Sequence, residues 1–293
     1  MSGLERMRVS VKQINLFGPL LRPSIGGCPR AWGYAYLDRL KLEWLPPHLV
    51  DGIKFHKCCE SLIRTGRMPE PQELQPGVVL TEEDVRPEGH FGRMARAAII
   101  HLPRRDWAEG PMAEKLGLGW RAEGEYLFDW TTSKGVECSI DLRPDLHSDN
   151  VSEMWFIDWK STSNKRHALK TLRHDVQANT YAYGLMRSFG KLTTKARWVY
   201  VDKKNYASWP VDQDFGITET TDWLHNNVDA TLELIHTFRE AKLAAIDLPP
   251  DIESCGGVGR FCDNKDRCLQ GPVGALPSRL IQLDEIIRYK EGK

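Results

Sequence analysis

The sequence has no excess of charge of either sign, since 40 Lys and Arg residues balance 40 Asp and Glu residues over 293 positions. Proteins that coat nucleic acid carry a large positive charge, so this balance excludes that class and allows only a local basic face. The sequence also lacks any run of about 18 apolar residues and has no apolar secretory signal in its first residues. We therefore expect a soluble, cytoplasmic protein with no membrane partner.

The sequence likewise lacks a paired set of cysteines, an internal repeat and a long linker. Seven cysteines are an odd number, and cytoplasmic cysteines are more often reduced, buried or metal-bound than joined in disulfides. The length is sufficient for one large core. We expect one domain over residues 1–293, with a helical part at about 28–118, a core at about 119–210, a C-terminal helix and Cys-rich segment at about 216–270, and a tail at 271–293.

Hydrophobic spacing predicts both helices and short strands. We expect an α/β fold with a small central mixed β-sheet flanked by helices. A loop is expected over 68–87, and the strand at 120–129 is expected to form a hairpin with the strand at 136–141. Helices are expected over 29–40, 48–64, 91–102, 168–186, 218–243 and 278–289, and strands over 120–129, 136–141, 156–160 and 196–202.

Two of these strands carry acidic residues, and one of them also carries a lysine. Asp141 ends the first strand, while Asp158 and Lys160 share one face of the second. If the strands are neighbours, two carboxylates could hold Mg²⁺, and the ammonium could orient or help deprotonate water and offset negative charge on a phosphodiester. Asp145, in the pair Pro144-Asp145, is the alternative first aspartate, although its surroundings indicate a turn. An ordinary surface ion pair is the alternative for Asp158 and Lys160.

The segment after Lys160 is basic and is expected to enter a helix. Lys170, His174, Gln177 and Tyr181 are spaced by four, three and four positions, which would give one polar stripe on the helix over 168–186. Such a stripe suits phosphate oxygens or a base, and the basic side chains suit contacts with the DNA backbone. The residues predicted to contact DNA are Lys165, Arg166, Lys170, Arg173 and His174; an exposed helix face is the alternative.

Asp141, Asp158-x-Lys160 and Gln177-x-x-x-Tyr181 together resemble the RecB-like branch of the PD-(D/E)xK nuclease superfamily. This branch includes AddB-type nucleases, CRISPR-adaptation nucleases and phage exonucleases. The segment Gly52-x-x-x-His56, followed by Glu60, resembles the motif that presents a histidine to the metal. The resemblance implies a restriction-endonuclease-like core in which the metal ligands are His56, Asp141 and Asp158, with Glu123 or Glu125 as further candidates.

The resemblance also implies an activity and partners. It indicates a Mg²⁺- or Mn²⁺-dependent DNA exonuclease in which Lys160 assists catalysis and Gln177 and Tyr181 position the strand. The substrate would be single-stranded DNA or DNA with accessible ends. The expected setting is recombination, repair or phage DNA processing, with a recombination or helicase protein as partner. The alternatives are a CRISPR-adaptation nuclease and an inactive, structural nucleic-acid-binding protein; the intact Asp/Asp/Lys set favours an enzyme.

Members of this branch that contain an iron–sulfur cluster have one cysteine before the nuclease core and three after it. The corresponding residues here are Cys28, Cys255, Cys262 and Cys268. Five residues separate the last two, as in the family, but six separate Cys255 from Cys262, where two are commoner. Four thiolates suit a [4Fe-4S] cluster or Zn²⁺, so both cofactors stay open. Cys58, Cys59 and Cys138 are interpreted as core or helix residues.

Overall fold

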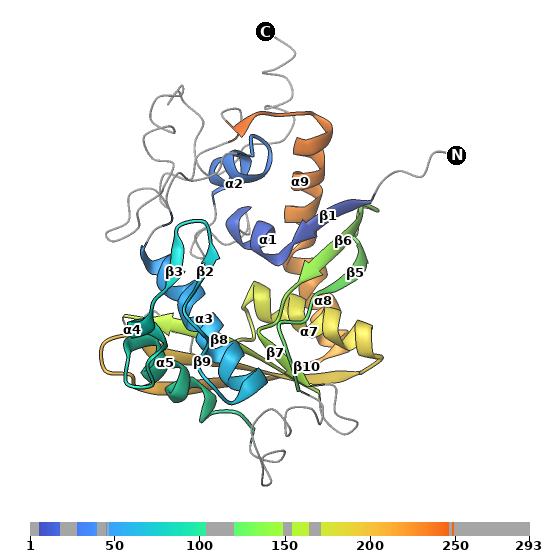
Figure 1. The fold of residues 1–293 in the computed structure, drawn as a ribbon. Coiled ribbons are helices and arrows are strands. Elements are labelled where there is room, and N and C mark those ends of the chain that lie inside the picture. Colours follow the sequence, from blue (N-terminus) through green and yellow to red (C-terminus); the bar gives the residue numbers. More distant parts are fainter. Residues whose placement is uncertain are drawn as a thin grey trace. The chain divides into compact units, whose positions relative to one another are not determined.

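The computed structural model describes residues 6–17, 28–39, 45, 47–103, 120–148, 154–163, 171–245 and 248. It confirms an α/β fold, with mixed β-sheets flanked by helices (Figure 1). The chain forms two compact units. Unit 1 comprises Met1–Glu43, Asp129–Asp141 and Asp222–Lys293, and unit 2 comprises Trp44–Phe128 and Leu142–Thr221. The single domain spanning the whole chain stays a prediction.

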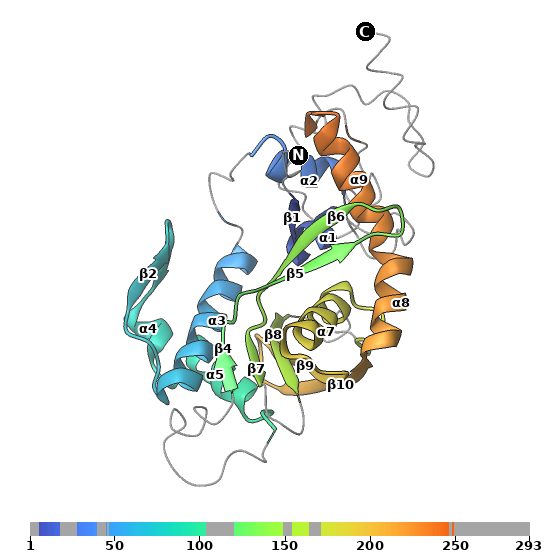
Figure 2. The same cartoon turned by 90° about the vertical axis from the view of Figure 1, so that its right-hand side faces the viewer.

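Unit 2 is built on a five-stranded sheet with the order β10-β9-β8-β7-β4. Strands β8 and β9 are parallel, whereas the pairs β9–β10, β7–β8 and β4–β7 are antiparallel, so the sheet is mixed. Figure 2 shows α7 along one side of β8, β9 and β10. The bounds are β4 Trp120–Ala122, β7 Leu146–Ser148, β8 Trp155–Thr162, β9 Thr193–Asp202, β10 Ser208–Gly216 and α7 Val176–Phe189.

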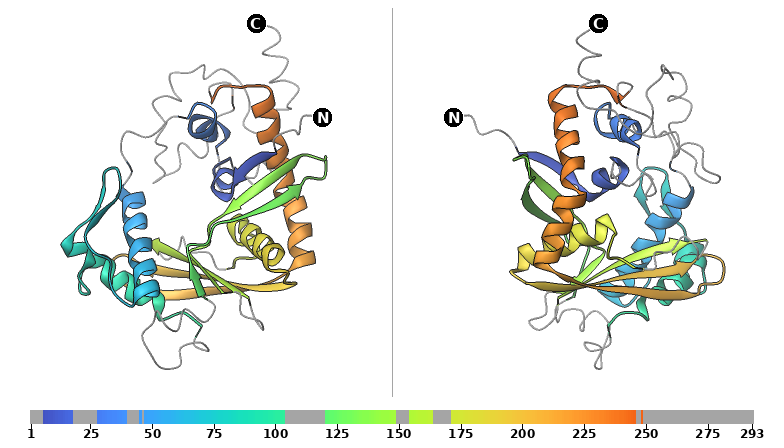
Figure 3. Two further views of the ribbon diagram at one scale, coloured as in Figure 1. Left: turned by 45° about the vertical axis from the view of Figure 1, so that its right-hand side comes forward. Right: turned by 180° about the vertical axis from the view of Figure 1, so that it is seen from behind.

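The two faces of β8 have different environments. Ile157 and Trp159 are buried in a core with side chains of α3 (Pro47–Thr65) and α5 (His90–Ile99). Lys160 projects from the opposite face and contacts Gln177 of α7. In the left view of Figure 3, α7 lies above β8, β9 and β10. The alternation predicted for this strand is therefore confirmed.

The helix that supports this polar face starts later than the sequence predicts. Asp175 is its N-cap: the carboxylate Oδ1 accepts a hydrogen bond from the backbone N–H of Ala178 at 2.7 Å. An N-cap aspartate satisfies an amide in the first helical turn that has no partner within the helix. His174 thus precedes the helix, and Lys170 lies outside the described residues, so only Gln177 and Tyr181 of the predicted stripe are on α7.

Three further elements of unit 2 occupy the region expected to be a loop. Strands β2 (Gln72–Gln75) and β3 (Val78–Leu80) form an antiparallel hairpin. The short helix α4 (Glu82–Val85) begins with a capping box between Thr81 and Asp84. This segment is rich in proline and acidic residues, but Val78 and Leu80 are fully buried, and their burial holds the hairpin in place.

Unit 1 contains the three-stranded sheet β1-β6-β5, in which β1 and β6 are parallel. Phe17 forms part of the core of unit 1. The centroid of its ring lies 5.4 Å from that of Trp32 and 5.8 Å from that of Phe238. The helix predicted over 218–243 is two helices, α8 and α9, that meet at Val228. The bounds are β1 Met7–Ser10, α1 Val11–Phe17, α2 Pro29–Tyr36, β5 Tyr126–Thr131, β6 Glu137–Leu142, α8 Ile217–Asn227 and α9 Asp229–Glu240.

The strands that carry Asp141 and Asp158 are not neighbours, contrary to the arrangement considered from the sequence. Asp141 is on β6 of the three-stranded sheet, whereas Asp158 is on β8, between β7 and β9. The single strand expected over 120–129 is two strands. Strand β5 pairs with β6, as the expected hairpin requires, whereas residues 120–122 form the separate strand β4, which pairs with β7. Strand β7 was not recognised in the sequence because it is three residues long and directly follows the turn-forming Pro144. No helix in the described ranges combines the length and apolar character needed to cross a bilayer.

Candidate active site

The register of β7 and β8 places two aspartates opposite each other. Leu146 pairs with Ile157, so one step further along this antiparallel pair brings Asp145 opposite Asp158. Opposite residues in antiparallel strands project from the same face, with Cβ atoms about 4.5–5.5 Å apart. The structure therefore places Asp145 beside the Asp158-x-Lys160 motif.

Two hydrogen bonds hold the Asp145 carboxylate. Its Oδ1 lies 3.0 Å from His56 Nδ1 on α3, and its Oδ2 accepts a hydrogen bond from the backbone N–H of Trp159 at 2.7 Å. The second bond ties Asp145 to the residue between Asp158 and Lys160. The first contact fixes the imidazole, and a histidine held by a carboxylate at Nδ1 is oriented to bind a metal through Nε2.

Asp158, Lys160 and Gln177 form a second group of contacts. Gln177 donates from Nε2 to Asp158 Oδ1 at 2.9 Å and accepts at Oε1 from Lys160 Nζ at 2.9 Å. Lys160 also forms an ion pair with Asp158 Oδ2. That oxygen is buried and accepts no hydrogen bond of normal geometry from the described groups. Gln177 thus fixes the positions of both charged side chains.

Burial and neighbouring charges shift the pKa of each ionisable group in these contacts. Burial raises the pKa of Asp158 to about 6, opposed by Lys160 and reinforced by Asp145. Burial lowers the pKa of Lys160, but attraction to Asp158 outweighs this and the net shift is upward. Burial also lowers the pKa of His56, but Asp145 outweighs it and raises the value to about 8. At neutral pH Lys160 is therefore an ammonium and acts through its positive charge.

Glu123, which directly follows β4, lies next to Asp145 in the chain pairing and adds a third acidic residue. Strands β4 and β7 pair through Ala122 and Leu146, and the backbone N–H of Glu123 donates to the Asp145 carbonyl at 2.9 Å. Glu123 has a positive φ of 50°, which turns the chain sharply after β4. Burial raises the pKa of its carboxyl, with help from Glu60 and Asp145. Glu125 instead forms an ion pair with Arg143 at 3.2 Å, and both side chains are exposed.

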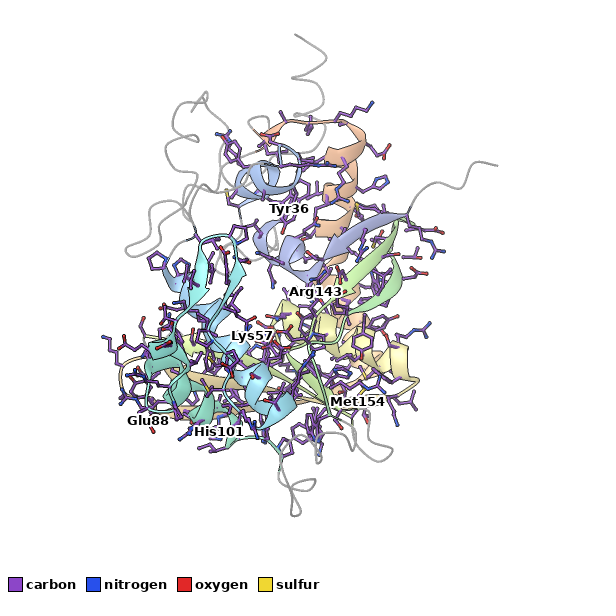
Figure 4. The ribbon with its side chains drawn as sticks, viewed as in Figure 1. Tyr36, Lys57, Glu88, His101, Arg143 and Met154 are labelled. Carbon is purple, nitrogen blue, oxygen red and sulfur yellow. The ribbon has the colours of Figure 1, made fainter. Side chains whose placement is uncertain are left out.

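A cavity of about 560 Å³ opens beside this group. It is lined by residues of α3, by Gln72, Glu73 and Leu74 of β2, and by Glu123. His56 and Glu60 are on the α3 wall, together with Lys57, which is labelled in Figure 4. The side chain of His56 is 33% exposed, so the imidazole can be reached from this cavity.

Comparison with known proteins identifies the family of the chain. A model of the PD-(D/E)XK nuclease superfamily matches residues 24–269. The chain belongs to this superfamily. The RecB-like resemblance found in the sequence is thereby supported, and Pro144-Asp145 together with Asp158-x-Lys160 corresponds to the pattern in the superfamily name.

One solved structure has a fold similar to that of this PD-(D/E)XK protein. The crystal structure of a candidate exonuclease from Eubacterium rectale aligns with a TM-score of 0.50 and 14% identity, covering 96% of this chain and 92% of that one. The protein SSO0001 aligns with a TM-score of only 0.30 and 13% identity, covering 55% of this chain and 62% of that one. No curated protein gives a significant match.

The remaining predicted site residues of this PD-(D/E)XK protein belong to unit 1, to unit 2 or to residues outside the described ranges. Asp141 is in unit 1, where its carboxylate pairs with Arg8 at 3.2 Å. Tyr181 is buried and donates from its hydroxyl to the carbonyl of Arg143 at 3.0 Å, so it supports the chain just before Asp145. Arg173 pairs with Glu219 at 3.1 Å in an exposed position. His174 is exposed, and Lys165, Arg166, Lys170, Cys255, Cys262 and Cys268 lie outside the described residues.

The residues present fit a divalent cation, although their described contacts are not those of a metal site. Among the described residues, no group of three or more His, Cys, Asp or Glu side chains is arranged to hold a metal. Asp145 and Asp158 nevertheless face one another, and burial disfavours the charged form of Asp158. A hard cation bound by both carboxylates would offset the repulsion between the negative charges of Asp145 and Asp158. Binding requires Lys160 to release Asp158 Oδ2.

Proposed function

We propose that this PD-(D/E)XK nuclease is a Mg²⁺- or Mn²⁺-dependent DNA exonuclease. The register that sets Asp145 opposite Asp158, within reach of His56, carries the proposal. We further propose that these three residues hold the cation, with Glu123 as an additional ligand. The sequence motifs favoured Asp141 for the first position; Asp145 replaces it in this proposal because it contacts both His56 and the strand of Asp158.

The bound cation would lower the pKa of a water molecule and offset charge on the phosphate. Lys160 supplies a second positive charge on the same face, and its raised pKa keeps it protonated there. Gln177 holds Lys160 and Asp158 in fixed relative positions, and Asp145 holds His56. Tyr181 is a positioning residue that acts through the backbone of Arg143 rather than through the DNA strand.

A cleavage assay tests the proposal. Purified protein is incubated with end-labelled linear DNA and with circular DNA in Mg²⁺, Mn²⁺ or EDTA. We expect linear DNA to be degraded in either metal but not in EDTA, circles to resist, and Asp158→Ala to lower the rate by about 10³-fold, the scale on which removing one charge-stabilising group lowers kcat. Cleavage of circles would make the enzyme an endonuclease. Binding without cleavage under every condition would favour the inactive, structural alternative.

We also propose a [4Fe-4S] cluster on Cys28, Cys255, Cys262 and Cys268. Of these residues, the structure describes only Cys28, which is buried at the N-cap position of α2. Its position before the nuclease core is the one at which the resemblance expects the first cysteine ligand. Burial raises the pKa of Cys58 and of Cys138 to about 12 and that of Cys59 well above its usual value, so these three thiols are poor ligands.

Iron analysis of the purified protein tests the cluster. We expect brown protein with about four iron atoms per chain, as a [4Fe-4S] centre requires. Cys28→Ser should lose the colour and most of the iron because a ligand is missing, whereas Cys138→Ala, which removes a thiol outside the set, should keep both. Colourless protein with stoichiometric zinc would replace the iron assignment by zinc.

A further inference from the structure

A row of three side chains crosses the sheet of unit 2 on the face that carries Asp158. Lys160 on β8 is in register with Tyr200 on β9, and Tyr200 is in register with Trp209 on β10. Residues in register on neighbouring strands project from the same face. Neighbouring strands are about 4.8 Å apart, so Trp209 lies two spacings, or roughly 10 Å, along the sheet from Lys160.

The two aromatic side chains of this row are stacked. The rings of Tyr200 and Trp209 are nearly parallel, with centroids 5.8 Å apart and an interplanar angle of 13°. Tyr200 is buried, whereas Trp209 is half-buried on the edge strand β10. Pro210, which lacks a backbone N–H, follows Trp209, as is common on edge strands. Tyr200 therefore supports an indole ring that is partly open to solvent.

The surroundings of Lys160 show how this aromatic surface joins the candidate active site. Lys160 Nζ lies 5.6 Å from the ring centroid of Trp198, the residue in register with Asp158. Trp198 is fully buried and Tyr200 is buried, so these two rings form a buried aromatic layer between Lys160 and the half-buried Trp209. A nucleic acid strand whose phosphate meets Lys160 would bring an adjacent nucleotide to Trp209.

We infer that Trp209, supported by Tyr200, is a stacking site for an unpaired base next to the phosphate that is cleaved. Aromatic rings stack on all four bases, because every base has a π-face, so the site would bind single-stranded DNA without sequence preference. A paired base already stacked in a duplex cannot use it without leaving the duplex. The site would therefore favour single strands or frayed ends. This inference rests on the proposed nuclease function and adds a strand preference to it.

Oligonucleotides with one abasic position test the inference. Binding of labelled single-stranded DNA is measured by fluorescence anisotropy, with Ca²⁺ in place of Mg²⁺, for wild type, Trp209→Ala and Trp209→Phe. Trp209→Ala should weaken binding about tenfold, since stacking on one aromatic ring is worth about that factor or more. Trp209→Phe should recover most of this loss. The abasic change at the stacked position should weaken wild-type binding by a similar factor but leave Trp209→Ala unaffected.

Trp155→Ala is the matched control. Trp155 is a half-buried tryptophan on β8 that packs with the core on the opposite face of the same sheet. Its removal should leave the abasic effect unchanged. Equal binding by wild type and Trp209→Ala, or additive losses from Trp209→Ala and the abasic change at every position, would overturn the stacking site. Wild-type cleavage in Mg²⁺ is scored separately, so a failed stacking site with active enzyme leaves the nuclease function intact, and wild type that neither cleaves nor binds overturns both.

Discussion

Asp145→Asn is expected to lower metal-dependent DNA cleavage by about 10³-fold, whereas Asp141→Asn is expected to change it by no more than a few fold. The first substitution removes the negative charge opposite Asp158, one of the two carboxylates that would hold the proposed cation. The second alters a carboxylate that is paired with Arg8 in unit 1. Initial rates on end-labelled linear DNA, at several Mn²⁺ concentrations, provide the measurement.

Asparagine is chosen for Asp145 because the side chain has structural contacts as well. Its Oδ2 accepts from the Trp159 backbone, and an amide oxygen can still accept that hydrogen bond. Thermal unfolding in EDTA should show only a modest loss of stability, from the ion pair with His56, while Mn²⁺ binding measured by calorimetry should weaken strongly. If Asp141→Asn abolishes cleavage and Mn²⁺ binding while Asp145→Asn retains both, Asp141 is the ligand, as the sequence first indicated.

The polar face of β8 was predictable from the sequence. Side chains alternate between the two faces of any strand, so the prediction does not depend on knowing the neighbouring strand. Asp158 and Lys160 were assigned to one face, and Ile157 and Trp159 to the other, from their positions alone. The contacts of Lys160 with α7 and the burial of Ile157 and Trp159 confirm this. The helix that contains His56 was also predicted, since α3 has a long helical pattern that ends close to the expected residue.

The partner strand of β8 was not predictable in the same way. Asp145 was read as part of a turn, because β7 has only three residues and depends on β4 and β8 for its hydrogen bonds. Such a short strand has no periodicity of its own, so its register is set by tertiary pairing. The literal Pro144-Asp145 pair was the only local signal. By contrast, Asp175 is a typical N-cap residue that indicates where α7 begins. The spacing of Lys170, His174, Gln177 and Tyr181 instead favoured a helix that begins at about residue 168.

Lys160→Met is expected to have the second large effect, on cleavage and on stability together. The rate should fall by about 10²–10³-fold, because a positive charge beside the phosphate is lost. In EDTA the unfolding free energy should fall by about 1–3 kcal/mol, because Asp158 is left buried without its ion-pair partner. Cleavage assays and denaturant unfolding of the same preparations measure the two effects.

A double variant separates the two roles of Lys160. Asp158→Asn combined with Lys160→Met removes both charges, so it should recover much of the stability in EDTA and none of the activity. Mn²⁺ should raise the melting temperature of Lys160→Met more than that of wild type, because the cation supplies the positive charge that the buried carboxylates lack. A double variant as unstable as Lys160→Met, or equal Mn²⁺ shifts in the two proteins, would mean that Lys160 stabilises the sheet through packing against Trp198 rather than through its charge.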